Sequence, residues 1–338
     1  MLAWLAPLTA LAVASGLHAA TPACRMGPPG GDSFCQVRGA RLHLVDWGGR
    51  GPPLILLAGL NNSARIFDDL APRLTGRHHV YAFTRRGFGL SEQTADGYEM
   101  AALSQDVAGL MDALGIARAD IVGHSIAGGE LSRVAADAPQ RVRRLVYLDA
   151  AYDRSDVGRL AVGDPAEPRA PPAAALRDLA TLADWRARAL GFASPAIAAD
   201  LRDTHRPGPD GLVGRTPRLL SQAVSAGDRA APPRYERIQA PALALYAPKL
   251  RPEQVPPEAS LARRRAAWAF SVANARPWML REKARFEAAI GCGQAWEAPG
   301  AGHYAFLERP AATATVIEAF LATPDPCHDA SVAAALVR

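Results

Sequence analysis

The sequence predicts an α/β protein with a doubly wound, mostly parallel sheet and an inserted helical segment. Three observations lead to this fold class. Short apolar runs, such as residues 54–57, alternate with stretches of helical composition, as expected for strands buried on both faces of a parallel sheet. The alternation lapses over residues 152–237 and resumes at residues 242–246. At Ser125 an apolar strand is followed at once by a helical stretch.

The N-terminus predicts a secretory signal peptide over residues 1–20. This stretch has no Lys, Arg, Asp or Glu, and its apolar run ends in small residues, with Ala19 and Ala20 as cleavage points. Because a positive charge is missing, an uncleaved anchor or a wrongly chosen start codon stays open, although the run is short for a membrane span. We expect a secreted or periplasmic protein with no stable membrane span after cleavage.

Four cysteines, an even number, follow this segment, which fits an oxidising compartment. Three pairings are possible. We favour Cys24 with Cys35 and Cys292 with Cys327, because each pair is near in sequence and would clip one end of the chain. No Cys-x-x-Cys pair is present, so we expect no zinc site.

The net charge of +5 does not by itself indicate a nucleic-acid partner. The arginines form short, scattered clusters, and carboxylates are interspersed among them, as on solvated helix faces. We therefore expect no nucleic-acid partner, and we expect no cofactor or metal. The oligomeric state stays open.

In the first half of the chain the elements alternate regularly. A Gly- and Pro-rich loop at 24–35 precedes an edge hairpin at 36–47. We then expect strands at 54–57, 79–83 and 121–122 and helices at 63–74 and 100–114, the latter with apolar residues at helical spacing. A Gly-rich turn at 84–91 separates the second strand from the second helix.

The second half contains the insertion. A helix at 126–138 and a strand at 142–148 precede it. Within it we expect helices at 176–190, 196–202 and 217–224, with a turn-rich break at 207–214. A strand at 242–246, a helix at 261–290 broken before Pro277, a strand at 295–296 and a helix at 310–322 follow. The predicted organisation is a core of residues 21–151 and 238–338 with a helical cap at 152–237.

The turn at Ser125 has the composition of a nucleophile elbow. In such a turn a strained serine exposes its hydroxyl above the sheet, and only small neighbours leave room for it. The usual pattern is Gly-x-Ser-x-Gly, and here Ala127 takes the last position. The pentapeptide alone fits an ordinary turn with a solvated serine equally well, so the context decides.

Four motifs in order give the sequence a resemblance to the α/β-hydrolase superfamily over nearly all of its mature length. They are the apolar strand that opens into Ala58-Gly59, the turn at 86–91, the elbow at Ser125 and a late Gly302-His303 before the last helix. The resemblance is to a serine esterase or lipase-like member with a helical lid. It implies the α/β-hydrolase fold and the chain order serine, acid, histidine.

The elbow serine needs a base to take its proton and a carboxylate to orient that base. Of eight histidines, His303 alone lies in a Gly-flanked loop after the last predicted strand. The family usually carries the acid after the strand at 242–246, but no Asp follows it here. Some members carry it one strand earlier, where Asp149 stands. Asp153 and Glu253 are the alternatives.

An oxyanion requires two backbone N–H donors aimed at one point. The amide of Ile126, directly after the elbow serine, is one candidate. The resemblance implies the amide of Leu60 as the other. Many relatives have His-Gly where this chain has Ala58-Gly59.

These residues and the resemblance predict a serine hydrolase that cleaves a carboxylic ester or related acyl bond of a small-molecule acyl substrate through an acyl-enzyme. Peptidase, thioesterase, carbon–carbon bond hydrolase and cofactor-free haloperoxidase activities are also compatible with a serine nucleophile. Dehalogenases and epoxide hydrolases of this fold use a carboxylate at the elbow, which Ser125 argues against. A non-catalytic binding protein on the same scaffold is the alternative from another class.

Overall fold

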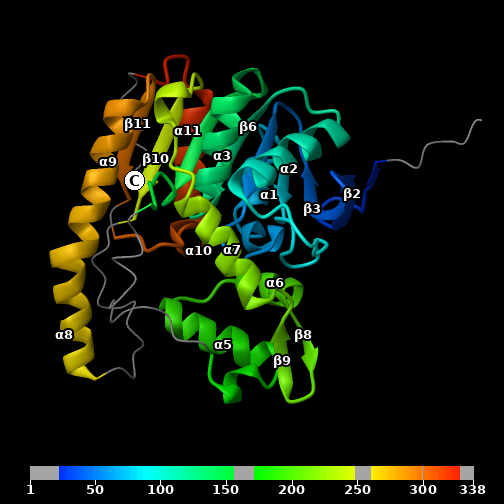
Figure 1. Ribbon diagram of the computed structural model, residues 1–338, viewed down its shortest axis with the longest axis vertical. Helices are drawn as coiled ribbons and strands as arrows, with labels where there is room; N and C mark the ends of the chain where they lie inside the picture. Colours follow the sequence, from blue (N-terminus) through cyan, green and yellow to red (C-terminus); the bar gives the residue numbers. More distant parts are fainter. Residues whose placement is uncertain (1–22, 156–170, 248–259, 299, 328–338) are drawn as a thin grey trace, which may run out of the picture.

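A computed structural model describes residues 23–155, 171–247, 260–298 and 300–327 of the chain (Figure 1). The predicted signal peptide and Glu253 lie outside the described residues. None of the helices within these ranges combines the length and the apolar composition that a membrane crossing requires.

Nine strands of the described residues form one sheet, in the spatial order β1-β2-β3-β5-β4-β6-β7-β10-β11. The last six in this order pair in parallel, and β1, β2 and β3 add an antiparallel edge. The fold-class prediction of a mostly parallel sheet is therefore confirmed. The strands are β1 (Cys24–Arg25), β2 (Asp32–Val37), β3 (Ala40–Gly48), β4 (Pro53–Leu57), β5 (His79–Phe83), β6 (Ala119–His124), β7 (Val142–Leu148), β10 (Ala242–Tyr246) and β11 (Gly293–Glu297).

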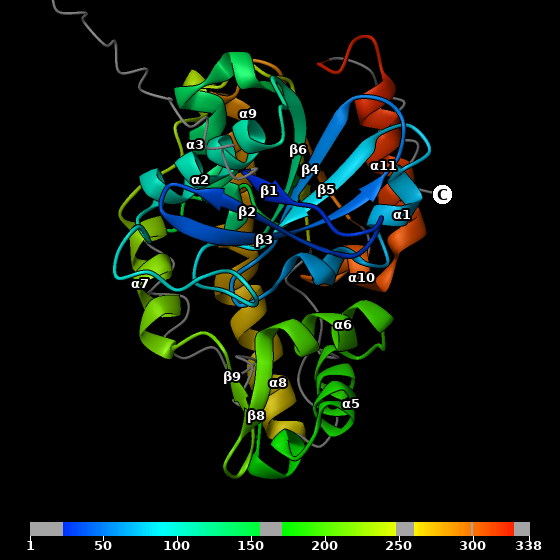
Figure 2. The ribbon, with the colours of Figure 1, turned by 90° about the vertical axis from the view of Figure 1, so that its right-hand side faces the viewer.

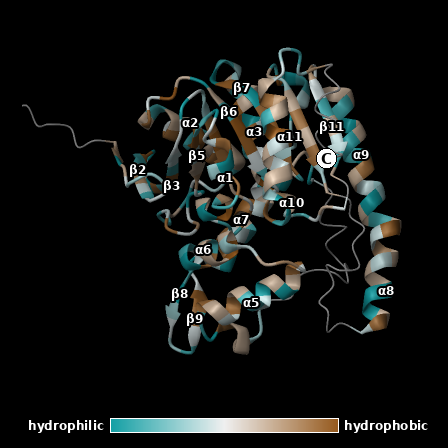
Figure 3. Cartoon of the chain, turned by 180° about the vertical axis from the view of Figure 1, so that it is seen from behind, coloured by the Kyte–Doolittle hydropathy of each residue, from teal (hydrophilic) through white to brown (hydrophobic). Residues whose placement is uncertain are grey.

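Helices cover both faces of the sheet (Figure 2). One face carries α2 (Met100–Ala113), α3 (Ala127–Asp137) and α9 (Arg276–Ala289), and the other carries α1 (Ala71–Leu74), α10 (Ala305–Glu308) and α11 (Pro310–Ala322). All residues of β6 and β10 are buried, which explains their continuous apolar runs. In Figure 3 the hydrophobic colour is concentrated on such central strands.

The inserted segment folds between β7 and β10, and we call its described residues, 171–237, the cap. In Figure 1 most of the cap forms a lobe beyond one edge of the core, and α7 runs from this lobe toward the core. Its elements are a 3₁₀ turn η3 (Ala173–Leu176), α5 (Leu179–Leu190), α6 (Pro195–Thr204), β8 (His205–Gly208), β9 (Gly211–Gly214), α7 (Arg218–Arg229) and η4 (Tyr235–Arg237).

Part of the cap differs from the prediction. The expected turn-rich break at 207–214 is mostly a hairpin, in which β8 and β9 pair antiparallel. Pro209 and Asp210 form its tight turn, and Gly211 after them adopts a φ of 125°. Each strand has only four residues, which is too short for an alternating pattern to stand out in the sequence.

Two predicted helices also differ in detail. The break expected before Pro277 is absent, because a π-helical segment (Ser271–Ala275) joins α8 (Leu261–Phe270) to α9. Pro277 stands in the first turn of α9, where a missing N–H costs little. The helix expected at 63–74 is two pieces, a 3₁₀ turn η1 (Ala64–Phe67) and α1, which has Pro72 in its first turn.

Both favoured disulfides, Cys24–Cys35 and Cys292–Cys327, are present, so this prediction is confirmed. Cys24 and Cys35 are also partners in the pairing of β1 with β2, within the stretch where we expected only a loop. The other bridge ties the chain just before β11 to the residues that follow α11. Each end of the sheet is thus held by one covalent link.

Candidate active site

Ser125 occupies a sharp turn between the end of β6 and the start of α3, with a φ of 56°. This left-handed conformation is unusual for a residue other than glycine and marks a strained position. The turn needs small neighbours: a Cβ on Gly123 would lie 2.1 Å from Leu131 Cδ2, and one on Gly128 would lie 1.9 Å from the Ala150 carbonyl oxygen. Ala127 is fully buried and fits the place of the usual glycine.

The structure brings Ser125, His303 and Asp149 together in one chain of hydrogen bonds. His303 Nε2 lies 3.1 Å from Ser125 Oγ, and His303 Nδ1 lies 2.6 Å from Asp149 Oδ2. The serine follows β6, the aspartate follows β7, and the histidine lies in the loop after β11. The carboxylate is buried, whereas the imidazole is about one-third exposed. The arrangement can pass a proton from a hydroxyl to an imidazole that a carboxylate orients.

The second oxygen of Asp149 is held by two further donors. The Ala247 amide donates to Asp149 Oδ1 over 3.1 Å, and the Tyr152 hydroxyl donates to the same oxygen. Burial, together with the Asp149 charge, raises the pKa of Tyr152 well above its ordinary value, so the phenol stays protonated and donates. These contacts leave Oδ2 directed at His303.

The alternative acids are placed differently. Asp153 accepts a hydrogen bond from the Ser155 amide and pairs with the Arg285 guanidinium. The structure does not describe Glu253. Ala247, directly after β10, contributes an amide at the end of the strand where many relatives carry the acid.

The two predicted oxyanion donors lie beside the elbow. Ile126 is the N-cap residue of α3, and Leu60 follows Gly59 in the loop after β4. Within the described part of the chain, neither amide donates to another protein group. The side chains of both residues belong to a small apolar cluster with Leu220 and Val224 of α7. A cap helix thus packs on this side of the elbow.

A buried ion pair, which the sequence reasoning missed, supports residues 58–63, the β4 loop. Arg85 donates to the carbonyl oxygens of Ala58 (2.9 Å) and Gly59 (3.2 Å), and its guanidinium pairs with Glu130 of α3. Fixing these carbonyls fixes the orientation of the peptide groups that follow. The available signal was a second arginine next to Arg86 in the turn at 84–91.

The cap also contacts the β4 loop through Asp200 of α6, another residue that the sequence did not indicate. Its carboxylate accepts hydrogen bonds from the Ser63 amide (2.6 Å), the Ser63 hydroxyl (3.0 Å) and the Asn62 side chain (2.9 Å). Asn62 Oδ1 in turn accepts from the Tyr304 hydroxyl over 3.3 Å. Burial raises the pKa of Asp200 to about 6. The network links the cap, the β4 loop and the residue after His303.

His124, next to the serine, is a fully buried packing residue. Its Nε2 lies 2.9 Å from the carbonyl oxygen of His303. Burial holds the pKa of His124 well below its ordinary value, so the ring is neutral and Nε2–H donates this bond. It packs against Tyr304 and Phe306. His124 therefore fixes the backbone of the loop that carries His303.

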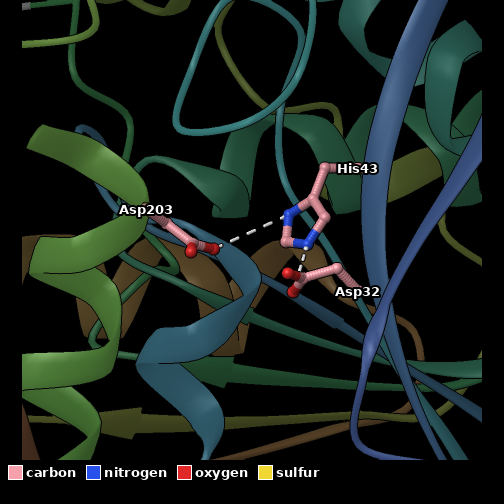
Figure 4. A group of neighbouring side chains, drawn as sticks. All are labelled: Asp32, His43 and Asp203. Carbon is pink, nitrogen blue, oxygen red and sulfur yellow. Dashed lines mark hydrogen bonds and ion pairs between the residues drawn. The ribbon is translucent and has the colours of Figure 1, made fainter. Parts of the chain in front are cut away.

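One group of side chains in the described residues has the composition of a metal site: Asp32, His43 and Asp203 (Figure 4). Both ring nitrogens of His43 already have partners, since Nδ1 lies 2.8 Å from Thr84 Oγ1 and Nε2 lies 3.2 Å from Asp32. Arg65 also pairs with Asp32. We interpret the group as a polar link between β2, β3 and α6.

Comparison with known proteins agrees with the fold described above. A family model described as alpha/beta hydrolase fold matches residues 52–205. The chain is 35% identical over 101 residues to 2-(acetamidomethylene)succinate hydrolase of Mesorhizobium japonicum, which is 30% of this chain and 36% of that protein. It is 37% identical over 115 residues to a non-heme chloroperoxidase of Streptomyces lividans, 33% of this chain and 42% of that protein. These matches thus span less than half of each relative.

A solved structure extends the similarity of fold to most of the chain. The crystal structure of E-2-(acetamidomethylene)succinate hydrolase superposes with a TM-score of 0.63 at 21% identity, over 86% of this chain and 99% of that one. The fold is therefore that of the α/β hydrolases. The family match over residues 52–205 agrees with this fold assignment.

Proposed function

We propose that this protein is a serine hydrolase that cleaves a carboxylic ester or a related acyl bond. The observation that carries the proposal is the chain of hydrogen bonds from Ser125 Oγ through His303 to Asp149. Its members follow the order serine, acid, histidine along the sequence, as in other hydrolases of this fold.

In the proposed reaction His303 Nε2 takes the Ser125 proton while Oγ attacks the carbonyl carbon of the substrate. The amides of Ile126 and Leu60 donate to the oxyanion that forms. Asp149 stabilises the imidazolium, which then protonates the leaving alcohol. Water, deprotonated by His303, hydrolyses the acyl-enzyme and restores the free serine.

The proposal places the protein outside the cytoplasm, in the periplasm or the medium. Two disulfides support an oxidising compartment, and the apolar N-terminal stretch has the composition of a signal peptide.

The same groups serve peptidases, thioesterases and carbon–carbon bond hydrolases, so a substrate panel has to separate these activities. A non-catalytic binding protein is the other alternative. The left-handed Ser125 argues against it, since backbone strain of this kind collects at functional sites.

The first test is labelling with a fluorophosphonate, which reacts only with an activated serine. We expect the wild-type protein to be labelled and Ser125→Ala not to be. Turnover of 4-nitrophenyl esters by Ser125→Ala should fall by about 10⁴-fold or more at unchanged circular dichroism. If the variant hydrolysed these esters at a near-normal rate, the proposed nucleophile would be wrong.

A further inference from the structure

A cavity of about 330 Å³ lies between the cap and the β4 loop. Three cap helices contribute to its wall, with Trp185 and Arg186 from α5, Asp200 from α6 and Arg218 from α7. Asn61 of the β4 loop completes this part of the wall. The size suits a small organic molecule better than a polymer.

The cavity wall is connected to the proposed reaction centre through the β4 loop. Asn61 directly follows Leu60, the proposed oxyanion donor. Asp200 holds Asn62 by a hydrogen bond, and Asn62 accepts one from Tyr304, the neighbour of His303. A substrate whose carbonyl oxygen points at the Leu60 amide can therefore extend one of its ends under the cap.

The wall of the cavity carries more positive than negative charge. Its wall contains two guanidinium groups, from Arg186 and Arg218, and one carboxylate, from Asp200. That carboxylate already accepts three hydrogen bonds from the β4 loop. Within the described ranges, neither arginine forms a salt bridge.

The positive charge of Arg186 influences the pKa of three neighbouring side chains. Burial raises the pKa of both Asp200 and Tyr304, and the Arg186 charge opposes each rise. Burial lowers the pKa of His205, and the Arg186 charge lowers it further. His205 is therefore neutral at pH 7 and does not add to the positive charge, so the excess positive charge comes from the two arginines.

We infer that the substrate carries a carboxylate at the end remote from the scissile bond, and that Arg186 and Arg218 bind it under the cap. Guanidinium groups match the planar geometry of a carboxylate and remain charged at all relevant pH values. Trp185 and Leu182 supply apolar surface for the short chain between the carboxylate and the reacting carbonyl. The inference rests on the proposed function and assigns it a substrate class, the monoesters of short dicarboxylic acids.

The test compares the mono-4-nitrophenyl ester of glutaric acid with its neutral methyl ester. We expect the wild-type kcat/KM to be at least about 10-fold higher for the charged ester, as for hydrogen bonds to a charged group. Arg186→Gln should abolish the preference by lowering kcat/KM much more for the charged ester than for the neutral one, while the fluorophosphonate still labels Ser125. Arg218→Gln should reduce it less, because Arg218 is more exposed than Arg186.

Arg188→Gln is the matched control. Arg188 lies on the same helix two residues further on, is exposed and pairs with Asp184. Arg188→Gln should leave kcat/KM unchanged for both esters. An unchanged preference in Arg186→Gln, or a wild-type protein without any preference, would overturn the inference.

A binding measurement separates this inference from the proposed function. Calorimetric titration of Ser125→Ala with glutarate needs no turnover, and we expect about 10-fold weaker binding when Arg186→Gln is added. A labelled, active enzyme that does not bind glutarate would refute the carboxylate site alone. Binding that depends on Arg186, in a protein whose serine is not labelled, would refute the hydrolase alone.

Discussion

Asp149 illustrates what the sequence could and could not predict about single residues. Ser125 and His303 follow from local motifs, whereas Asp149 follows only from its place at the end of the strand at 142–148 and from the absence of an aspartate after the strand at 242–246. The structure places it 2.6 Å from His303, which the sequence could only suggest. Tyr152 and Ala247, which hold its other oxygen, have no local signal, because tertiary packing alone brings them there.

Asp149→Asn should lower kcat by about 10⁴-fold with little change in KM, because an amide holds the imidazole in the unproductive tautomer. Steady-state kinetics on a 4-nitrophenyl ester measures this. Asp153→Asn is the control, since Asp153 pairs with Arg285 rather than with His303. A mild loss in Asp149→Asn, with a severe one in Asp153→Asn or Glu253→Gln, would reassign the acid.

Among the elements, those of the core were predicted better than those of the cap. The predicted helix at 310–322 coincides with α11, and each predicted parallel strand has its counterpart, because buried apolar runs are read directly from the sequence. The hairpin β8–β9 and the π-helical turn before α9 depend on a four-residue pairing and on one extra residue in a helix. Neither the hairpin nor the π-helical turn produces a periodic pattern in the sequence.

At the same scale, α6 should influence catalysis through Asp200. Asp200→Ala removes the acceptor of three hydrogen bonds from Asn62 and Ser63, so the β4 loop that carries the Leu60 amide is held less firmly. We expect kcat to fall by about 10- to 100-fold and KM to change less, because removing one oxyanion donor costs about 100- to 1,000-fold. Steady-state kinetics and thermal denaturation are the measurements.

Asp178→Ala is the control for this prediction. Asp178 caps α5 in the same lobe, and its side chain accepts a hydrogen bond from the Thr181 amide. Its loss should lower the melting temperature slightly and leave kcat unchanged. If both variants had the kcat of the wild-type protein, the β4 loop would not depend on Asp200.

For the whole molecule, the sequence predicted which layers form but not how the cap and core share polar contacts. The buried contacts of Arg85 with Glu130 and of Asp200 with Ser63 cross between elements far apart in the chain. Their residue types alone suggest exposed surface charge, since buried charged side chains are uncommon. Only the folded structure shows that these charged side chains find hydrogen-bond partners in the interior.

The disulfides should contribute to global stability. Replacing Cys292 and Cys327 by serine should lower the free energy of unfolding by roughly 4 kcal/mol, and replacing Cys24 and Cys35 by roughly 3 kcal/mol, since the loops closed span 35 and 11 residues. Urea denaturation measures both. The exported protein, denatured without reductant, should show no titratable thiol, and four free thiols would contradict the oxidised state.

Ser125 and His303 meet across a separation of 178 residues. Contacts between such distant positions are expected to form late in folding. The conformational entropy of the intervening chain is lost before the contact contributes any stabilisation. A partly folded chain can therefore acquire the parallel strands around Ser125 while its serine still lacks a base. Until the loop that carries His303 docks, the Ser125 hydroxyl has no partner to take its proton, so the proposed hydrolase would acquire its nucleophile only with this last contact.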